Sequence, residues 1–170
     1  MAIINQERVN QAMEVLRAGL APFIERKVQA AMKAGSVSMD AVRRSADDPM
    51  LGNKPLSQWN VAGLLKLTWD TWNAVFAPTL GRVERFLVQE VRDWRNKWAH
   101  QVPFSGDDTD RALDSITRLL TAVSAPQSDY VHRMKMERRR LIFDEKARAQ
   151  RATKPGNVLG RAEPDLLDAL

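Results

Sequence analysis

The sequence contains no cysteine among its 170 residues. Disulfide bonds and thiolate metal sites are therefore excluded, and such a composition is typical of a reducing compartment. The chain also lacks the apolar core of a secretory signal near its start. It has no run of about 20 apolar residues that could span a bilayer. These absences predict a soluble cytoplasmic protein with no membrane partner.

Familiar catalytic signatures are missing as well. The sequence contains no H-E-x-x-H pair, no phosphate-binding loop, no G-x-G-x-x-G turn and no nucleophile elbow. Only two histidines are present, His100 and His132. Any chemistry that needs an imidazole therefore has two candidates.

What the sequence does contain is positive charge and helical periodicity. The net charge is +5 and the isoelectric point is about 9.9. A basic balance favours polyanions, although many proteins without a nucleic-acid role are equally basic. Apolar residues recur every three or four positions, and strand-like alternation is nearly absent. We therefore expect an all-α fold, a helical bundle with a long, basic final helix.

The expected helices are separated by glycine, proline and turn residues. They cover approximately residues 5–33, 38–44, 57–72, 72–77, 79–100, 107–124 and 126–152. Ser38, Ser57 and either Asp107 or Asp108 have the side chains expected of helix N-caps. Pro22 is a candidate for a kink, and residues 45–55 are expected to form a loop. We expect one helical domain over residues 1–152, followed by a linker or mobile segment, 153–170, that could lead to a further domain.

The helix expected over residues 79–100 carries the strongest functional signal. Its apolar residues form a stripe, and its polar residues gather on another face. The stripe comprises Leu80, Val83, Leu87, Val91, Trp94 and Trp98, and the polar face comprises Arg85, Arg92, Asn96 and His100. Arg95 lies at the rim, about 60° from the centre of the stripe.

Two interpretations of this polar face remain open. Arginines beside a buried stripe usually form a solvated face, and a histidine near a helix end usually compensates the helix dipole. Alternatively, a guanidinium, an amide and an imidazole within six residues can bind a phosphate and move a proton. An ideal helix holds Arg95 and His100 about 140° apart, so we expect backbone irregularity in the last turn to bring them closer.

The segment 95–101, R-N-K-W-A-H-Q, resembles the R-x(4-6)-H motif of the HEPN (higher eukaryotes and prokaryotes nucleotide-binding) superfamily. Residues 72–76 and 20–26 are similar to one branch of it, named for the synthetic-lethal-with-TREX endonuclease and found in bacterial anti-phage proteins. The resemblance covers residues 5–152. It implies a helical bundle that pairs about a two-fold axis, with one Arg and one His from each copy in a shared cleft.

The resemblance also implies roles for individual residues. Arg95 would hold the scissile phosphate of RNA, His100 would act on the 2′-hydroxyl proton or the leaving oxygen, and Asn96 would orient one of them. The cleavage would need no metal and no cofactor, and would leave a 2′,3′-cyclic phosphate. Arg92 and Lys97, beside this site, are expected to bind RNA.

The expected final helix is rich in basic residues, including Arg138 and Arg139. It could track an RNA backbone, and we expect Arg138 and Arg139 to bind RNA. It could equally be a solvated helix or a connector to another domain. His132 has no arginine at the motif's spacing and is expected to be structural.

Two further clusters have simple structural explanations. The acidic cluster of Asp107, Asp108 and Asp110 fits helix capping better than a metal site. The five tryptophans fit core packing better than base stacking.

Three hypotheses follow for the whole chain. The first is a homodimeric, metal-independent endoribonuclease with a role in anti-phage defence or as a toxin. The second is a non-catalytic pairing or nucleic-acid-binding module of a larger defence ATPase. The third, a DNA-binding helical regulator, is the weakest, because no pair of recognition helices is evident.

Overall fold

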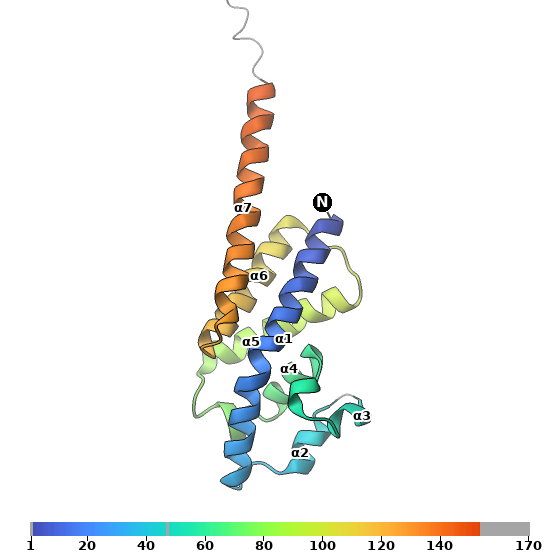
Figure 1. Ribbon diagram of the computed structural model, residues 1–170, viewed down its shortest axis with the longest axis vertical. Helices are drawn as coiled ribbons and strands as arrows, with labels where there is room; N and C mark the ends of the chain where they lie inside the picture. The colour runs from blue at the N-terminus through green and yellow to red at the C-terminus, as the bar shows by residue number, and fades with distance from the viewer. Residues whose placement is uncertain (1, 47, 154–170) are drawn as a thin grey trace, which may run out of the picture. The chain divides into compact units, whose positions relative to one another are not determined.

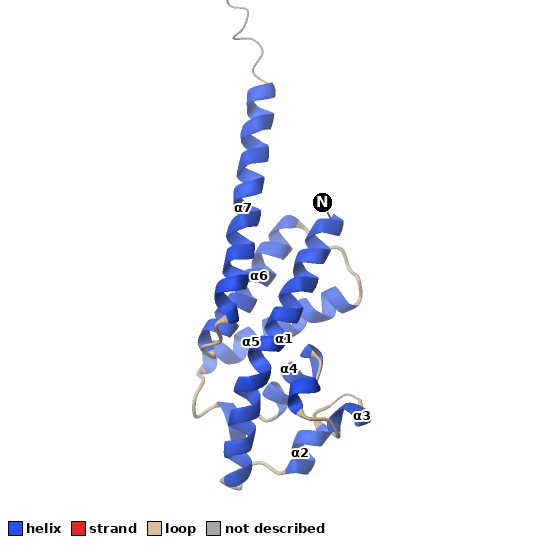
Figure 2. Ribbon diagram, in the orientation of Figure 1, coloured by secondary structure: helices blue, strands red, loops and turns tan. Residues whose placement is uncertain are grey.

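The computed structural model describes residues 2–46 and 48–153. Every regular element in these residues is helical, which confirms the expected all-α fold (Figures 1 and 2). In chain order the elements are α1 (Ala2–Lys33), α2 (Met39–Arg44), α3 (Pro49–Gly52), η1 (Leu56–Gln58), α4 (Val61–Asp70), η2 (Trp72–Phe76), α5 (Arg82–Ala99), α6 (Gly106–Ala122) and α7 (Gln127–Ala152). The chain divides into two units after Lys135, within α7. Our expectations for residues 154–170 lie outside the described residues.

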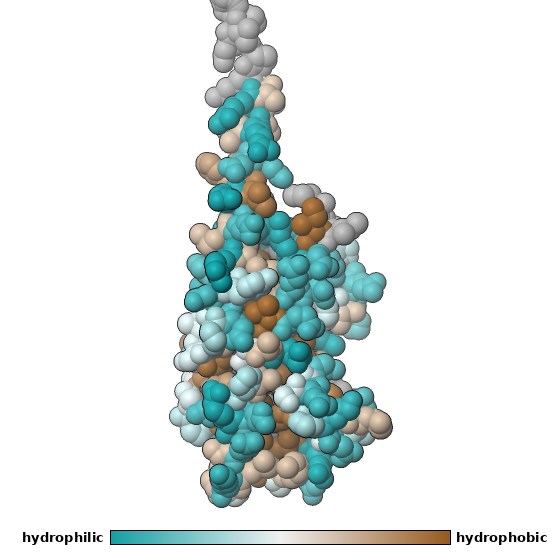
Figure 3. Space-filling model, viewed as in Figure 1, coloured by the Kyte–Doolittle hydropathy of each residue, from teal (hydrophilic) through white to brown (hydrophobic). Residues whose placement is uncertain are grey.

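The core of the first unit forms around α1. Helix α1 packs against α4 and α6, and α5 packs against the same two helices. Helix α1 buries apolar residues at three- and four-residue spacing, which are Val9, Ala12, Met13, Leu16, Leu20 and Phe23. Hydrophilic side chains cover most of the face seen in Figure 3. No helix in the described residues is long and apolar enough to cross a bilayer.

The expected helix caps were partly wrong. Ser38 does cap α2, because its Oγ accepts a hydrogen bond from the Ala41 amide at 3.1 Å. The cap of α4 is Asn60 rather than Ser57, which lies in the short helix η1. The cap of α6 is Ser105, not Asp107 or Asp108. Asn60 lies nearer to the apolar run than Ser57, and Ser105 lies further from it than Asp107. In both cases the cap is the residue with the extended backbone that a cap requires.

Two prolines lie within helices. Pro22 lies inside α1, which continues as one helix on both sides of it. Pro49 opens the one-turn helix α3 within the segment expected to be a loop, and Asp48 caps it with a hydrogen bond of 2.9 Å to the Met50 amide. Proline is favoured at this first position because no amide hydrogen is needed there.

Three helices end with a residue in the left-handed backbone region. Gly35, Gln101 and Ser124 have φ angles of 76°, 57° and 57°. After α5, the amides of Gln101 and Val102 donate back to the last turn at 3.0 and 3.1 Å. This pair of bonds is the Schellman motif, which satisfies the final carbonyls of a helix and redirects the chain.

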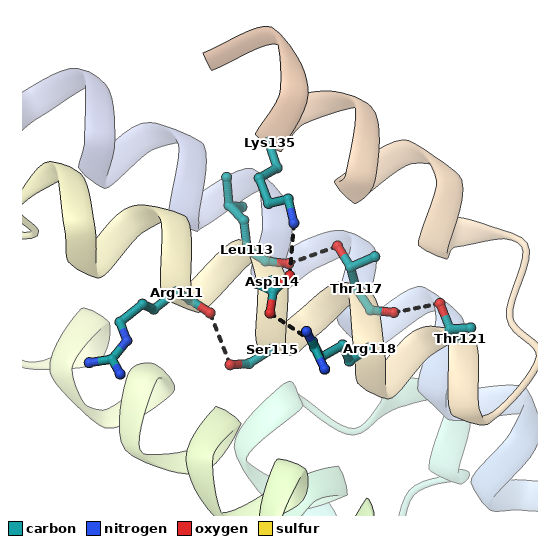
Figure 4. Close-up of polar contacts among 8 residues, drawn as sticks. All are labelled: Arg111, Leu113, Asp114, Ser115, Thr117, Arg118, Thr121 and Lys135. Carbon is teal, nitrogen blue, oxygen red and sulfur yellow. Dashed lines mark hydrogen bonds and ion pairs between the residues drawn. The ribbon is translucent and has the colours of Figure 1, made fainter. Parts of the chain in front are cut away.

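Asp114 anchors the start of α7 to α6 (Figure 4). Its carboxylate accepts hydrogen bonds from Lys135 Nζ at 2.8 Å and from Arg118 Nε at 2.7 Å. The bond from Lys135, followed by the one from Arg118, lowers the pKa of Asp114 below its ordinary value. The ammonium group of Lys135 is largely buried, so this pair is part of the packing of the first unit.

Candidate functional site

Helix α5 positions the residues that the sequence singled out. It begins after Gly81, whose amide donates to Glu84 Oε2 at 2.9 Å. Its fully buried residues are Val88 and Val91. Val83, expected in the buried stripe, is 69% exposed. Val88 and Val91 lie seven and four positions before Arg95, so the buried side of the helix is closer to Arg95 than the stripe predicted.

Arg95 is partly buried and incompletely hydrogen bonded. Its Nε is buried and has no hydrogen-bond partner among the described residues. Its Nη1 donates to Asn96 Oδ1 at 3.4 Å; the orienting role of Asn96 stays a prediction. The guanidinium borders a small hollow of about 40 Å³ between α4 and α5. The hollow is lined by Ala62, Leu65, Lys66, Arg92, Arg95 and Asn96.

Positively charged side chains lie beside this hollow. The guanidinium of Arg85 lies 4.6 Å from the ring centre of Trp69, and that of Arg92 lies 5.9 Å from it. Neither these two arginines nor Arg95 makes an ion pair with a carboxylate in the described part of the chain. Lys66 does, with Asp70 at 2.7 Å. The surface around this hollow therefore carries unpaired positive charge, which suits a phosphate backbone.

The sequence did not point to Lys66 or Trp69 as parts of this site. Both lie on α4, and only the packing of α4 against α5 brings them beside the arginines. Trp69 is partly buried and carries guanidinium groups on its ring, in a cation–π arrangement. Neither the prediction of a core tryptophan nor that of a base-stacking tryptophan anticipates this cation–π contact.

His100 is exposed and forms the C-cap of α5. Its amide still donates to the Asn96 carbonyl at 3.0 Å. The expected irregularity is therefore absent before His100, because the left-handed turn begins only at Gln101. Arg95 and His100 keep the wide angular separation of a regular helix. Of the two hollows along this part of α5, neither is lined by both residues.

Lys97 has a structural partner. Its Nζ lies 2.7 Å from Asp108 Oδ2 and 5.3 Å from the centre of the Phe104 ring. The bond from Lys97 and those from Ser105 lower the pKa of Asp108. Asp108 thus takes part in the capping box of α6, where its carboxylate accepts the Ser105 amide. In the described residues no three metal-ligating side chains come together. RNA binding by Lys97 stays a prediction.

A larger hollow lies between the start of α1 and the end of α5. Its volume is about 640 Å³. It is lined by Gln6, Glu7 and Asn10 of α1 and by Trp98, Ala99, Gln101 and Pro103. The buried Asn5 donates its side-chain amide to the Phe104 carbonyl at 3.2 Å, which fastens α1 to the loop beside this hollow.

The remaining predicted residues lie on α7. His132 is exposed in the first unit, and Arg138 and Arg139 occupy consecutive positions in the second. Arg139 is exposed. RNA binding by the last two stays a prediction.

Comparison with known families gives one result. A family model described as Swt1-like HEPN matches residues 11–124, well over half of the chain. The match includes Arg95, Asn96 and His100 and ends just after α6. Comparisons with curated proteins and with solved structures gave no match.

Proposed function

Because the chain belongs to the Swt1-like HEPN family, whose domains are generally RNase-like modules, we propose that it is a metal-independent endoribonuclease. Two copies pair, and Arg95 and His100 from both copies face one phosphodiester. The products carry a 2′,3′-cyclic phosphate. Resemblance to the anti-phage branch of the family supports a role in defence or as a toxin, in the cytoplasm, with further domains or subunits as partners.

One observation carries the two-copy arrangement. Arg95 borders the α4–α5 hollow, whereas His100 is exposed at the end of α5 and borders neither hollow. Within one copy, therefore, neither hollow joins the two groups. A second copy that places its own α5 end against the first would supply the missing group.

The chemistry follows from the two side chains. The 2′-oxygen attacks phosphorus, the bond from phosphorus to the 5′-oxygen breaks, and that oxygen takes up a proton. His100 acts on the 2′-hydroxyl proton or on the leaving oxygen. Arg95 binds the non-bridging oxygens, where charge develops in the transition state. Asn96 holds the Arg95 guanidinium in place through the bond at 3.4 Å.

Mixing two inactive variants tests this proposal. We expect Arg95→Ala and His100→Ala each to lower the rate of RNA cleavage in EDTA by at least about 100-fold, with unchanged helical content. Mixed dimers of the two variants retain one arginine and one histidine, so cleavage should partly return after subunit exchange. Arg43→Ala and His132→Ala are the matched controls, since both side chains are exposed and lie outside residues 95–100.

Two results would contradict the proposal. Cleavage by His100→Ala at the wild-type rate would remove the histidine from the chemistry. A mixture that stays inactive while forming dimers would show that the site is not shared between copies.

A non-catalytic pairing module is the second candidate. Val83 and Phe86, one turn apart on α5, are 69% and 68% exposed. Two large apolar side chains in contact with water favour an interface. Sedimentation should then show a dimer that Phe86→Ser dissociates, together with no cleavage of any RNA by the wild-type chain.

A further inference from the structure

We propose that the hollow between the start of α1 and the end of α5, here called the amide pocket, binds an unpaired nucleobase of the RNA. It comprises Gln6, Glu7, Asn10, Trp98, Ala99, Gln101 and Pro103. We further propose that it selects bases with an exocyclic amino group. This inference depends on the proposed function for its substrate, but it concerns a different surface and has a separate test.

The polar lining of the amide pocket suits a base edge rather than a phosphate. Gln6, Asn10 and Gln101 each offer both donors and an acceptor. Glu7 adds a carboxylate, and among the described residues no lysine or arginine lines the pocket. A phosphate would meet negative charge here without a cation, whereas the edge of an unpaired base finds complementary groups. The volume of about 640 Å³ is within the usual range for small-molecule sites.

The pocket also contains a flat surface for stacking. The indole of Trp98 is only partly buried and forms one wall, with Pro103 nearby in the lining. Single-stranded bases bind proteins chiefly by stacking on such aromatic faces. Trp98 therefore combines core packing with an accessible ring, a dual role that helical spacing alone does not reveal.

Two features indicate that the walls are held in place. The buried amide of Asn5 ties α1 to the Phe104 carbonyl. Gln101 has a φ of 57°, where glycine is the favoured residue. A side chain in this conformation costs about 1 kcal/mol, and strained residues cluster at functional sites. At Gln101 this conformation places a third side-chain amide in the pocket.

The amide pocket and the hollow that Arg95 borders lie one after the other along one face of α5. Arg92 and Asn96 line the hollow, and Ala99 lines the pocket. These residues are four and then three positions apart, so they lie on the same side of the helix. Ala99 is about 5 Å beyond Asn96 along the helix axis. An RNA strand with one phosphate at Arg95 can therefore place a neighbouring base in the pocket.

Glu7 supplies the selectivity. An ionised carboxylate only accepts hydrogen bonds. Adenine, cytosine and guanine each carry an amino group that can donate to it, whereas uracil presents carbonyl oxygens at its corresponding positions. We therefore expect uracil to be the least favoured base. Because Glu7 is exposed, its replacement by glutamine should not affect folding.

Binding of mononucleotides to the full chain tests the pocket directly. The indole N–H signal of Trp98 in the NMR spectrum, assigned with Trp98→Phe, reports occupancy. We expect AMP, CMP and GMP to shift it and to bind about tenfold more tightly than UMP. Glu7→Gln should abolish this difference. Glu14→Gln, which makes the same charge change at an exposed position two turns along α1, should preserve it.

The outcomes separate this inference from the proposed function. Nucleotides that shift the Trp98 signal in a protein that cleaves no RNA would support the pocket and contradict the nuclease. Cleavage with equal rates at all four bases, unchanged by Glu7→Gln, would support the nuclease and overturn the pocket. Tighter binding of UMP than of AMP would also overturn it.

Discussion

Lys97 Nζ lies 2.7 Å from Asp108 Oδ2, and this bond joins the last turn of α5 to the first turn of α6. Both side chains are less than one third exposed. The same carboxylate oxygen accepts the Ser105 amide at 3.2 Å. Lys97 therefore fixes the helix end that carries Arg95 and His100, in addition to any contact it makes with RNA.

Separate substitution of the two partners distinguishes these roles. We expect Lys97→Gln and Asp108→Asn each to lower the free energy of unfolding by about 1 kcal/mol, measured by urea denaturation. If Lys97 also binds RNA, only Lys97→Gln should weaken binding of an uncleavable RNA and reduce its salt dependence. Equal RNA affinities of the two variants would contradict an RNA contact by Lys97.

Relief of backbone strain should separate stability from base recognition. Replacing Gln101 or Ser124, both at a φ of 57°, with glycine should raise the free energy of unfolding by about 1 kcal/mol. Gln101→Gly should also weaken binding of AMP in the amide pocket, because an amide is lost. Ser124→Gly is the control and should leave AMP binding unchanged. A fall in melting temperature for both variants would contradict the prediction that the backbone is strained at these two residues.

Acid should destabilise the chain through two carboxylates. The pKa values of Asp108 and Asp114 are lowered in the folded protein, chiefly by hydrogen bonds from Lys97 and Lys135. Their contribution to stability is therefore present above the ordinary aspartate pKa of about 3.9 and is lost as the pH falls through the lower folded-state values. Asp114→Asn should make the melting temperature less dependent on pH in this range. An unchanged dependence would contradict the role of Asp114.

Gly19 marks a close approach of two helices. A Cβ there would lie 2.6 Å from Leu120 Cδ2 and 3.2 Å from the Ala125 Cβ. Leu120 is fully buried and has little room to move. Gly19→Ala gains about 1 kcal/mol in helix propensity, but overpacking costs about 1–3 kcal/mol. We expect a net loss in stability on urea denaturation, and a more stable variant would show that the interface can expand.

The helices and the buried side of α1 could be predicted from the sequence, because one periodic stripe faces one core. Local competition between polar side chains could not. Ser57 and Asn60 are both good caps, and the backbone at Asn60 decides between them. Val83 fits the apolar spacing of α5, but its exposure depends on where the core ends.

The site was predictable only along one helix. Residues 95–100 are contiguous, so a sequence motif can identify them. Lys66 and Trp69 join them through packing of α4 against α5. Gln6 and Asn10 reach the amide pocket across more than eighty residues of chain. No local pattern in a single sequence encodes such distant pairings.

The position of Trp69 has a practical consequence. Its indole ring faces two guanidinium groups, at 4.6 and 5.9 Å. An anion that binds beside the α4–α5 hollow and draws Arg92 toward itself would change the electric field at that ring. The emission wavelength of Trp69 would then respond to the arrival of a polyanion, so association could be followed in real time without a dye.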